Sequence, residues 1–338
     1  MPTIYDIAKK AGVSAATVSK VLNGRADVGA KTIEKVKRIT EELGYQPNSL
    51  ARGLATKKSK TIGVFFQDHL NSGFRHPFLQ DILASFKDVI GEHGYDLIFF
   101  ANNQPNNQAL SFEERAKDRN VDGLFLLGVP RTDPKLASLI KSEIPCISID
   151  LDLMGPRASY LSSDNIAGAI MAVDYLVEMG HRDIAYISDV FATKPGHDRL
   201  IGFKTAMEKH GLPILSKWIL ASDFSEQGGY QSTKKLLESK HLPTALFCAG
   251  DMMAIGAMQA IREKKLKIGE DISVIGFDDI NLLKYIAPRL TTIKQKKDVM
   301  GQLAAKELLK LMNGSPYFPT PVTVSVELVV RDTVVKRA

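Results

Sequence analysis

From Thr61 onward, short apolar runs alternate with longer amphipathic stretches, and this alternation restricts the possible folds more than any other feature of the sequence. Seven runs are typical of buried parallel strands: 62–66, 97–100, 123–127, 146–149, 184–187, 245–248 and 274–277. Helical periodicity separates them at 78–93, 108–119, 167–179, 198–210, 225–238 and 252–264. Repeated strand–helix units predict an α/β fold with doubly wound sheets, in which ligands bind beyond the carboxyl ends of the strands.

The length and composition indicate how many domains to expect and in which compartment. A chain of 338 residues, 44% of them apolar, is expected to form two or three compact units. Its start lacks the features of a signal peptide, and no stretch approaches the roughly 18 apolar residues of a membrane span. We therefore expect a cytoplasmic protein without a membrane partner. Two cysteines are too few for a disulfide framework or a zinc site, so Cys146 and Cys248 are expected in the core.

The positive charge of the chain is concentrated at its beginning. Residues 1–60 contain twelve Lys and Arg against five Asp and Glu, a net charge of +7, whereas the whole chain carries +6. A basic segment on a nearly neutral body suits a polyanion, since release of counterions from phosphates supplies much of nucleic-acid affinity. A solvated lysine-rich surface would give the same count, so charge alone leaves both interpretations open.

Two short helices are predicted within this basic segment. A helix capped by Thr3 should run through Ala11, and a second helix capped by Ser14 should run to Asn23. Two short helices joined by a glycine-containing turn form a helix-turn-helix, whose second helix can enter the major groove of DNA. The side chains expected to face outward from it are small or polar: Ala15, Ala16, Thr17, Ser19 and Lys20.

A third helix is predicted from Ala30 to Leu43, with Gly44 as its C-terminal stop. A three-helix bundle that does not bind DNA would account for the helices. It would not account for the short outward side chains together with a net charge of +7. We therefore predict that this head binds double-stranded DNA.

Four stretches of the head form a recognisable pattern: Ile-Tyr-Asp-Ile-Ala at 4–8, Ala-Gly-Val-Ser at 11–14, Thr-Val-Ser-Lys-Val-Leu-Asn at 17–23 and Gly-Tyr-Gln-Pro-Asn at 44–48. They resemble the lactose/galactose repressor (LacI/GalR) family of bacterial transcription regulators, and the resemblance continues over essentially the whole chain. It implies that several residues bind phosphates or pack near them: Tyr5, Ser14, Thr17, Ser19, Asn23 and Thr32. It also implies that Ala15, Ala16 and Lys20 read bases. Lys20 stands where many relatives carry Arg, and a Lys donates to guanine without a rigid fork.

Residues 47–60 form the expected hinge between head and body. Asn48 can cap one or two helical turns, too few to persist in water without a partner. The resemblance implies that this segment folds on the operator as a pair of helices, one per subunit, with Leu54 wedged into the minor groove. A plain linker would account for 56–60 but not for Ala51 and Leu54 three positions apart, so Asn48, Ala51 and Leu54 are expected at the DNA.

The resemblance implies the periplasmic-binding-protein type I fold for the body. We expect a helix-turn-helix domain at 1–46 and the hinge at 47–60. An N-terminal lobe should consist of 61–162 and 291–320, and a C-terminal lobe of 163–290 and 321–338. The chain would then cross between the lobes near residues 162, 290 and 320.

Polar side chains near the ends of the predicted strands are candidate ligand donors. The polar candidates are Asp68, Asp150, Arg199, Asp251 and Asp278, and Phe224 is the aromatic candidate. Carboxylates and an Arg that converge with an aromatic ring suit a polyhydroxylated ligand such as a sugar. The resemblance places Arg199, Phe224 and Asp278 on effector positions of the family. Asp251 has an alternative role as the cap of its helix.

Two departures from the family pattern concern the ligand. Gly250 stands where the family usually has Asn, which removes one amide contact. The loop 67–78 is several residues longer than the usual turn ending in Asn-Pro-Phe, and Phe78 at its end is expected at the effector site. Two histidines and an arginine in this loop could meet an anionic group such as a sugar phosphate, or could face solvent.

An enzyme, a transport protein and a protein-controlled regulator are the alternatives. No HExxH, GxSxG, CxxC or GxxxxGK[ST] motif occurs, so no catalytic residue, metal site or cofactor is predicted. A solute-binding protein for transport would share the body fold but would carry a signal peptide and no basic head. A regulator whose co-regulator is another protein, such as a phosphocarrier, stays open.

The sequence therefore predicts a DNA-binding transcription regulator, a repressor, whose operator affinity is controlled by a small molecule. The expected effector is a sugar or a sugar derivative. A homodimer would place two recognition helices about one DNA turn apart on a near-palindromic operator.

Overall fold

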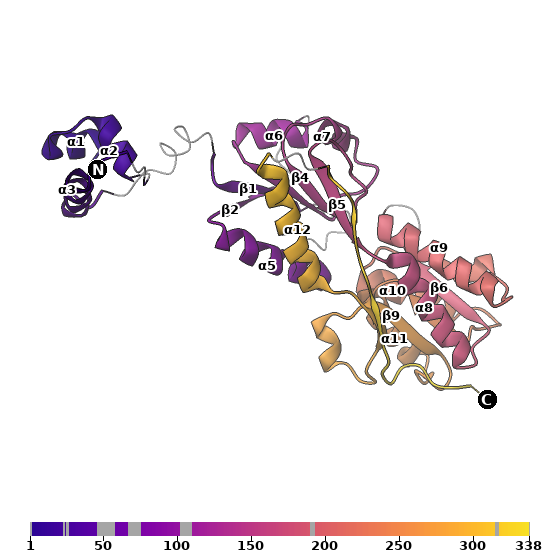
Figure 1. Cartoon of the computed structure of the whole chain (residues 1–338). Helices are drawn as coiled ribbons and strands as arrows, with labels where there is room; N and C mark the ends of the chain where they lie inside the picture. The colour runs from indigo at the N-terminus through magenta and orange to yellow at the C-terminus, as the bar shows by residue number, and fades with distance from the viewer. Residues whose placement is uncertain are drawn as a thin grey trace. The chain divides into compact units, whose positions relative to one another are not determined.

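The computed structural model describes residues 2–22, 24, 27–45, 58–66, 76–101, 110–189, 193–314 and 318–337. The chain divides into two compact units, Met1–Ser59 and Lys60–Ala338, which we call the head and the body (Figure 1). Most of the expected hinge, residues 47–57, lies outside the described residues.

The head contains three helices around one small core: α1 (Ile4–Ala11), α2 (Ala15–Leu22) and α3 (Ala30–Glu42). Thr3 caps α1 in a capping box with Asp6, and the Ser14 hydroxyl accepts a hydrogen bond from the Thr17 amide at 3.1 Å. Ile7, Val18 and Val36 are fully buried and join the three helices. The predicted caps and the predicted helices of the head are confirmed.

The first sheet of the body is entirely parallel, with the strand order β11-β5-β4-β3-β1-β2. Its strands are β1 (Thr61–Phe66), β2 (Asp96–Phe100), β3 (Gly123–Leu127), β4 (Cys146–Ile149), β5 (Ala158–Ser163) and β11 (Val322–Val324). The helices of this lobe are α5 (Pro77–Glu92), α6 (Phe112–Asp118), α7 (Ala137–Ile140) and α12 (Lys297–Met312), with a 3-10 turn η2 at Pro134–Leu136. Helices α5 and α12 pack against each other (Figure 1).

The second sheet has the order β12-β10-β9-β8-β6-β7 and is parallel except for β12, which pairs antiparallel with β10. Its strands are β6 (Ile184–Ser188), β7 (Ile219–Ala221), β8 (Ala245–Cys248), β9 (Ser273–Asp278), β10 (Thr291–Lys294) and β12 (Glu327–Val329). Its helices are α8 (Asn165–Glu178), α9 (Lys194–Lys209), α10 (Glu226–Leu236) and α11 (Asp251–Glu263), with 3-10 turns η3 (Ser216–Trp218) and η4 (Asn281–Tyr285). Both cysteines are buried, Cys146 in β4 and Cys248 in β8.

The chain passes between the two sheets later than expected at two of its three crossings, whereas the first crossing follows β5 near residue 162, as expected. Residues 291–294, assigned to the N-terminal lobe from sequence, form β10, which pairs with β9 in the second sheet. Residues 322–324, assigned to the C-terminal lobe, form β11, which pairs with β5 in the first sheet. Strand β11 forms an edge of the first sheet, whereas β10 lies between β9 and β12 in the second sheet. Neither strand has an apolar run like those of the predicted strands, since β10 reads Thr-Thr-Ile-Lys and β11 reads Val-Thr-Val.

Several predicted helix boundaries are wrong by a few residues. Helix α9 begins at Lys194 rather than at residue 198, because the Thr193 hydroxyl caps the amide of Gly196. Helix α6 begins at Phe112, where the Ser111 side chain caps Glu114. The 16-residue helix α12 was not predicted at all. Among the described helices, none is long and apolar enough to span a membrane.

Candidate functional site

The predicted DNA-contact residues of the head lie on α1, α2 and α3. Tyr5 is 73% exposed on α1, and Ala16 is exposed on α2. The hydroxyls of Ser14 and Thr17 lie 2.9 Å apart at the start of α2. Thr17, Ser19, Lys20 and Thr32 are half-buried. Four predicted contacts lie outside the described residues: Asn23, Asn48, Ala51 and Leu54.

Two residues of α2 that were expected to face outward without a partner lie in other surroundings. Ala15 is half-buried and packs against the core of the head. The Lys20 ammonium forms an ion pair with Asp27 at 2.6 Å, and both side chains are about half exposed. An exposed pair of this kind contributes little stability, so Lys20 can exchange Asp27 for another acceptor.

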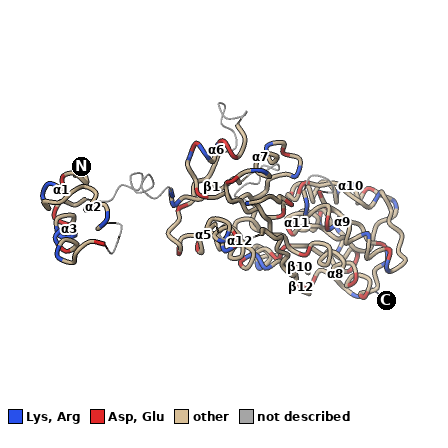
Figure 2. Tube along the Cα trace, turned by 45° about the horizontal axis from the view of Figure 1, so that its top comes forward, with Lys and Arg blue, Asp and Glu red and all other residues tan. Residues whose placement is uncertain are grey.

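Lysine and arginine residues lie along the head helices (Figure 2). Two of these cations, Lys10 and Arg38, share the carboxylate of Glu42 at 2.8 and 3.6 Å. A short helix with small or polar side chains at its start, in a unit of positive net charge, can approach the groove of a duplex.

A second candidate site lies in the body, around the buried guanidinium of Arg199 on α9. Its Nε donates to the side-chain oxygen of Asn165 at 2.8 Å, and its Nη1 donates to the carbonyl of Ala249. The guanidinium carbon lies 3.7 Å from the centre of the Phe277 ring and 5.9 Å from that of Phe224. These contacts hold the cation in one orientation, because a guanidinium that donates in its plane can stack through its faces.

Asp278, at the end of β9, supplies a negative charge beside Arg199. Its Oδ1 lies 3.6 Å from Nη1 of Arg199 and accepts a hydrogen bond from Gln295 Nε2 at 2.6 Å. Burial raises the pKa of Asp278 above its ordinary value, and the charge of Arg199 opposes this shift. Asp278 has a φ of 120°, so its backbone is strained where the strand ends, as is common at ligand-binding positions.

Asp150 brings the first sheet to this cluster. It follows β4 directly, and its electrostatic partners include Arg199 and Asp278 of the second lobe. Burial raises the pKa of Asp150 to about 6, against the attraction of Arg199. Its Oδ1 is buried, and no hydrogen bond to it is present among the described residues. A buried carboxylate oxygen without a donor is costly unless a ligand or water supplies one.

Asp251 has a different role from the one predicted. Its carboxylate is fully buried and is engaged within the protein on both oxygens. One oxygen accepts from the Thr292 hydroxyl at 2.6 Å, and the other accepts from the backbone amide of Ile280 at 3.0 Å. Asp251 lies at the first position of α11, after Gly250, so it does not cap that helix either. It joins α11 to the turn after β9.

The two aromatic candidates lie in different surroundings. Phe224 is half-buried beside Arg199, with a φ of 57°. Phe78 is only 5% exposed and packs into the hydrophobic core, so it supports the first lobe more than it offers a face to a ligand. A side chain at Gly250 would place its Cβ 3.1 Å from the Phe224 ring. The Asn side chain that the family usually has at position 250 would therefore be in tight contact with the Phe224 ring of this chain.

Sequence reasoning missed two polar residues of the cluster, Asn165 and Gln295. Asn165 begins α8 two residues after β5, which is the kind of position that identified the other candidates, but β5 was not predicted. Gln295 follows the equally unpredicted β10. Asp68 lies outside the described residues, and no group of residues in the described ranges could hold a metal ion.

Comparison with known families gives two matches that together cover most of the chain. Residues 3–48 match the family described as "Bacterial regulatory proteins, lacI family". Residues 173–334 match the family described as "Periplasmic binding protein-like domain". The first match covers the head, and the second covers most of the second lobe together with β11 and α12.

Individual relatives are similar over nearly the full length. The chain is 34% identical to the probable HTH-type transcriptional repressor ExuR of Bacillus subtilis, over 99% of this chain and 98% of that protein. Among solved structures, it resembles the lac repressor dimer bound to operator and the anti-inducer ONPF, with a TM-score of 0.85 and 30% identity over 99% of each chain. It also resembles the complex of the transcriptional regulator CelR with cellobiose, with a TM-score of 0.74 and 28% identity over 98% and 100% of the two chains.

Proposed function

The chain belongs to the lacI family of bacterial regulatory proteins, and from this premise we propose that it is a repressor whose hold on operator DNA is set by a sugar or a sugar derivative bound in the body. It is a DNA-binding transcription regulator rather than an enzyme. The observation that carries the effector proposal is the buried pair of Arg199 and Asp278 beside the Phe224 ring, with Asp150 of the first sheet within electrostatic range of the pair.

The chemistry of this cluster favours a polyhydroxylated ligand. The unbonded oxygen of Asp150 can accept from a hydroxyl, and the face of Phe224 can pack against a sugar ring. Arg199 holds Asp278 and the Phe224 ring in fixed positions, so the donors and acceptors are organised before the ligand arrives. The proposed effector residues are Asp150, Arg199, Phe224 and Asp278, with Asp68 and Phe78 at the border and Asp251 as an internal support. The relative CelR was solved with cellobiose, which supports a sugar for this chain.

Because the two lobes each contribute a carboxylate, a ligand that bridges them would change the free energy of their relative arrangement. The N-terminal lobe begins at Lys60, directly after the segment that leads to the head. A ligand that favours one arrangement would thereby shift the population that binds DNA, with a coupling of about 1–3 kcal/mol. The coupling is reciprocal, so operator DNA would change effector affinity by the same factor.

On the DNA side, we propose that a homodimer places two copies of α2 in successive major grooves of a near-palindromic operator. Ala16 and Lys20 would contact bases, Ala15 would allow the close approach, and Tyr5, Ser14, Thr17, Ser19, Asn23 and Thr32 would lie at phosphates. Residues 47–60, with Asn48, Ala51 and Leu54, would fold at the centre of the site. We place the protein in the cytoplasm with its DNA.

The test is a DNA-binding titration of the full chain in the presence of sugars. Operator fragments selected from a random pool would be followed by fluorescence anisotropy, with neutral hexoses, disaccharides, hexose phosphates and hexuronic acids added in turn. We expect one class to change the operator affinity about 5–150-fold, the range that a coupling of 1–3 kcal/mol gives. If no class changes it while the protein binds operator, the sugar proposal is wrong and a protein co-regulator becomes the next candidate.

A further inference from the structure

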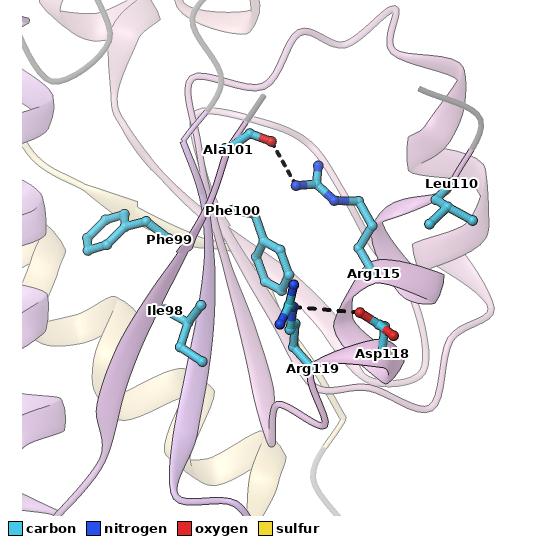
Figure 3. Close-up of a pocket in the computed structure, with 8 residues that line it drawn as sticks. All are labelled: Ile98, Phe99, Phe100, Ala101, Leu110, Arg115, Asp118 and Arg119. Atoms are coloured by element: carbon cyan, nitrogen blue, oxygen red, sulfur yellow. Dashed lines mark hydrogen bonds and ion pairs between the residues drawn. The ribbon is translucent and has the colours of Figure 1, made fainter. Parts of the chain in front are cut away.

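A separate cavity of about 190 Å³ lies at the side of the first lobe, between the edge strand β2 and helix α6. Its lining includes Ile98, Phe100 and Leu110 on the apolar side and Arg115, Arg119 and one carboxylate, Asp118, on the charged side. Figure 3 shows Arg115 of α6 and Arg119, which directly follows this helix, beside the ring of Phe100. None of these residues belongs to the cluster around Arg199.

The guanidinium of Arg115 is buried in an unusual environment. The residue is only 7% exposed, and its guanidinium carbon lies 5.0 and 5.1 Å from the ring centres of Phe65 and Phe100. Those two rings stack in parallel at 4.3 Å. The Nη2 atom donates to the carbonyl of Ala101 at 2.8 Å, whereas the buried Nε has no acceptor among the described residues. Burial lowers the pKa of Arg115, as expected for a cation away from water.

The carboxylates nearest in sequence are committed to other partners. Glu113 pairs with Lys117 at 2.8 Å, Glu114 accepts from Ser111 in the helix cap, and Asp118 lies 3.6 Å from Arg119. No ion pair of Arg115 occurs within the described part of the chain. A buried charge without a counterion is costly, and two aromatic rings with one carbonyl compensate only part of that cost. The residue therefore has donors that an added anion could satisfy.

We propose that this cavity binds a small organic carboxylate, with Arg115 as the buried cation and Arg119 at its mouth. A carboxylate suits a guanidinium because its two oxygens accept from two parallel N–H groups. The hydrocarbon part of the ligand would lie against Phe100 and Leu110. A cavity of about 150 Å³ in an apolar core accommodates benzene, so this one has room for a single ring or a short chain beside the carboxylate.

The test measures binding of benzoate to the full chain by isothermal titration calorimetry at moderate salt, with benzamide as the neutral isostere. We expect saturable binding of one benzoate per chain and none of benzamide. Arg115→Met keeps the length of the side chain and removes its charge, and should weaken benzoate binding about 30-fold or more. Lys117→Met, on the same helix but outside the cavity, is the matched control and should leave the affinity unchanged. Arg199→Met should also leave it unchanged, which separates this cavity from the proposed effector site.

A second pair of variants covers the case in which Arg115→Met does not fold. Leu110→Glu would place a carboxylate in the wall of the cavity, where it can satisfy Arg115 internally, so benzoate binding should disappear and the Tm should rise. Leu110→Gln has the same shape without the charge and should retain benzoate binding. The proposal is overturned if wild type shows no saturable benzoate binding, if benzamide binds equally well, or if Leu110→Glu binds benzoate as wild type does.

Discussion

The guanidinium of Arg199 lies 3.6 Å from the carboxylate of Asp278, and both side chains are only about 3% exposed. Two buried charges at this separation are stable only when further hydrogen bonds satisfy them. Arg199 donates hydrogen bonds to the Asn165 side chain and the Ala249 carbonyl, and Asp278 accepts a hydrogen bond from Gln295. The pair thus links α9 to the end of β9. A ligand that contacts either residue would contact a side chain that hydrogen bonds already hold in position.

Replacing Arg199 should separate effector sensing from DNA binding. In Arg199→Met we expect the response to an active sugar to be lost, because Asp278 and Phe224 lose the group that positions them. Operator affinity without effector should change by less than about twofold, since the head is a separate unit. The measurement is anisotropy of labelled operator with and without the sugar.

The control for this variant is Lys204→Met, an exposed change on the same helix, which should leave both properties intact. Because breaking a buried pair can destabilise a protein by several kcal/mol, circular dichroism must first show that the variant is folded at the working temperature. A folded Arg199→Met protein that still responds to the sugar would contradict the proposed site.

Asp150 should make the stability of the body depend on pH. Its pKa is raised to about 6 in the folded chain by burial, compared with 3.8 for an ordinary Asp. Between these values the folded state binds more protons than the unfolded state, so stability should fall as the pH rises from about 4 through 6. Asp150→Asn should therefore be more stable than wild type at pH 7.5, by about 1–3 kcal/mol, and no more stable below pH 4.

Urea unfolding at a series of pH values measures this difference directly. Asp152→Asn provides the matched control, because Asp152 pairs with Arg131 at a partly exposed position where burial costs little. An Asp150→Asn protein that gains no stability at pH 7.5 would show that the Asp150 carboxylate is better solvated than its surroundings indicate.

Much of the fold could be predicted because its long elements have strong periodicity. The seven predicted strands all occur, and buried runs such as Phe125 to Leu127 leave little alternative to a central parallel strand. The strands β5, β7, β10, β11 and β12 could not be found, since pairing with neighbouring strands rather than local sequence makes them strands. For the same reason the crossings expected near residues 290 and 320 were placed too early.

The site could be predicted only in part, because strand ends identify positions but not partners. Arg199, Asp150 and Asp278 come together, whereas Asp251 turns inward to Thr292 and Ile280. Nothing local in the sequence distinguishes Asp251 from Asp278. Asp278 directly follows the predicted strand 274–277, and Asp251 comes three positions after the end of the predicted strand 245–248. The difference lies in the tertiary packing of α11 against the turn after β9.

The close packing of α10 on α11 should make Gly256 sensitive to a single added carbon. A Cβ at this position would lie 1.9 Å from the carbonyl oxygen of Glu226 and 2.7 Å from the amide of Tyr230, both backbone atoms. Gly256→Ala should therefore destabilise the body by about 2–4 kcal/mol. Thermal and urea unfolding check this, with Gly91→Ala as the control.

Gly91 also lies within a helix, but a Cβ there would meet no atom within 4 Å. Gly91→Ala should stabilise the protein by about 0.5–1 kcal/mol through helix propensity. If both changes have the same sign and size, the helix contact at Gly256 is looser than the structure indicates.

Lys20 should contribute to sequence discrimination and not only to electrostatic attraction. We expect Lys20→Gln to weaken binding to the selected operator by about 1–3 kcal/mol and to reduce the preference for one base pair. Lys10→Gln removes one positive charge from α1, where Lys10 pairs with Glu42, and should weaken all sequences about equally. Identical effects of the two changes on operator and on random DNA would rule out base reading by Lys20.

The most direct test of the whole account is the salt dependence with which the purified full chain binds double-stranded DNA. A dimer with two basic heads should select a near-palindromic sequence from a random pool, and the logarithm of its binding constant should fall linearly with the logarithm of the salt concentration. The slope should decrease in magnitude by about one or two in the Lys10→Gln dimer, which loses one positive charge per head. If no duplex in the pool binds in a salt-sensitive manner, with or without sugars, the assignment of the head to DNA is wrong.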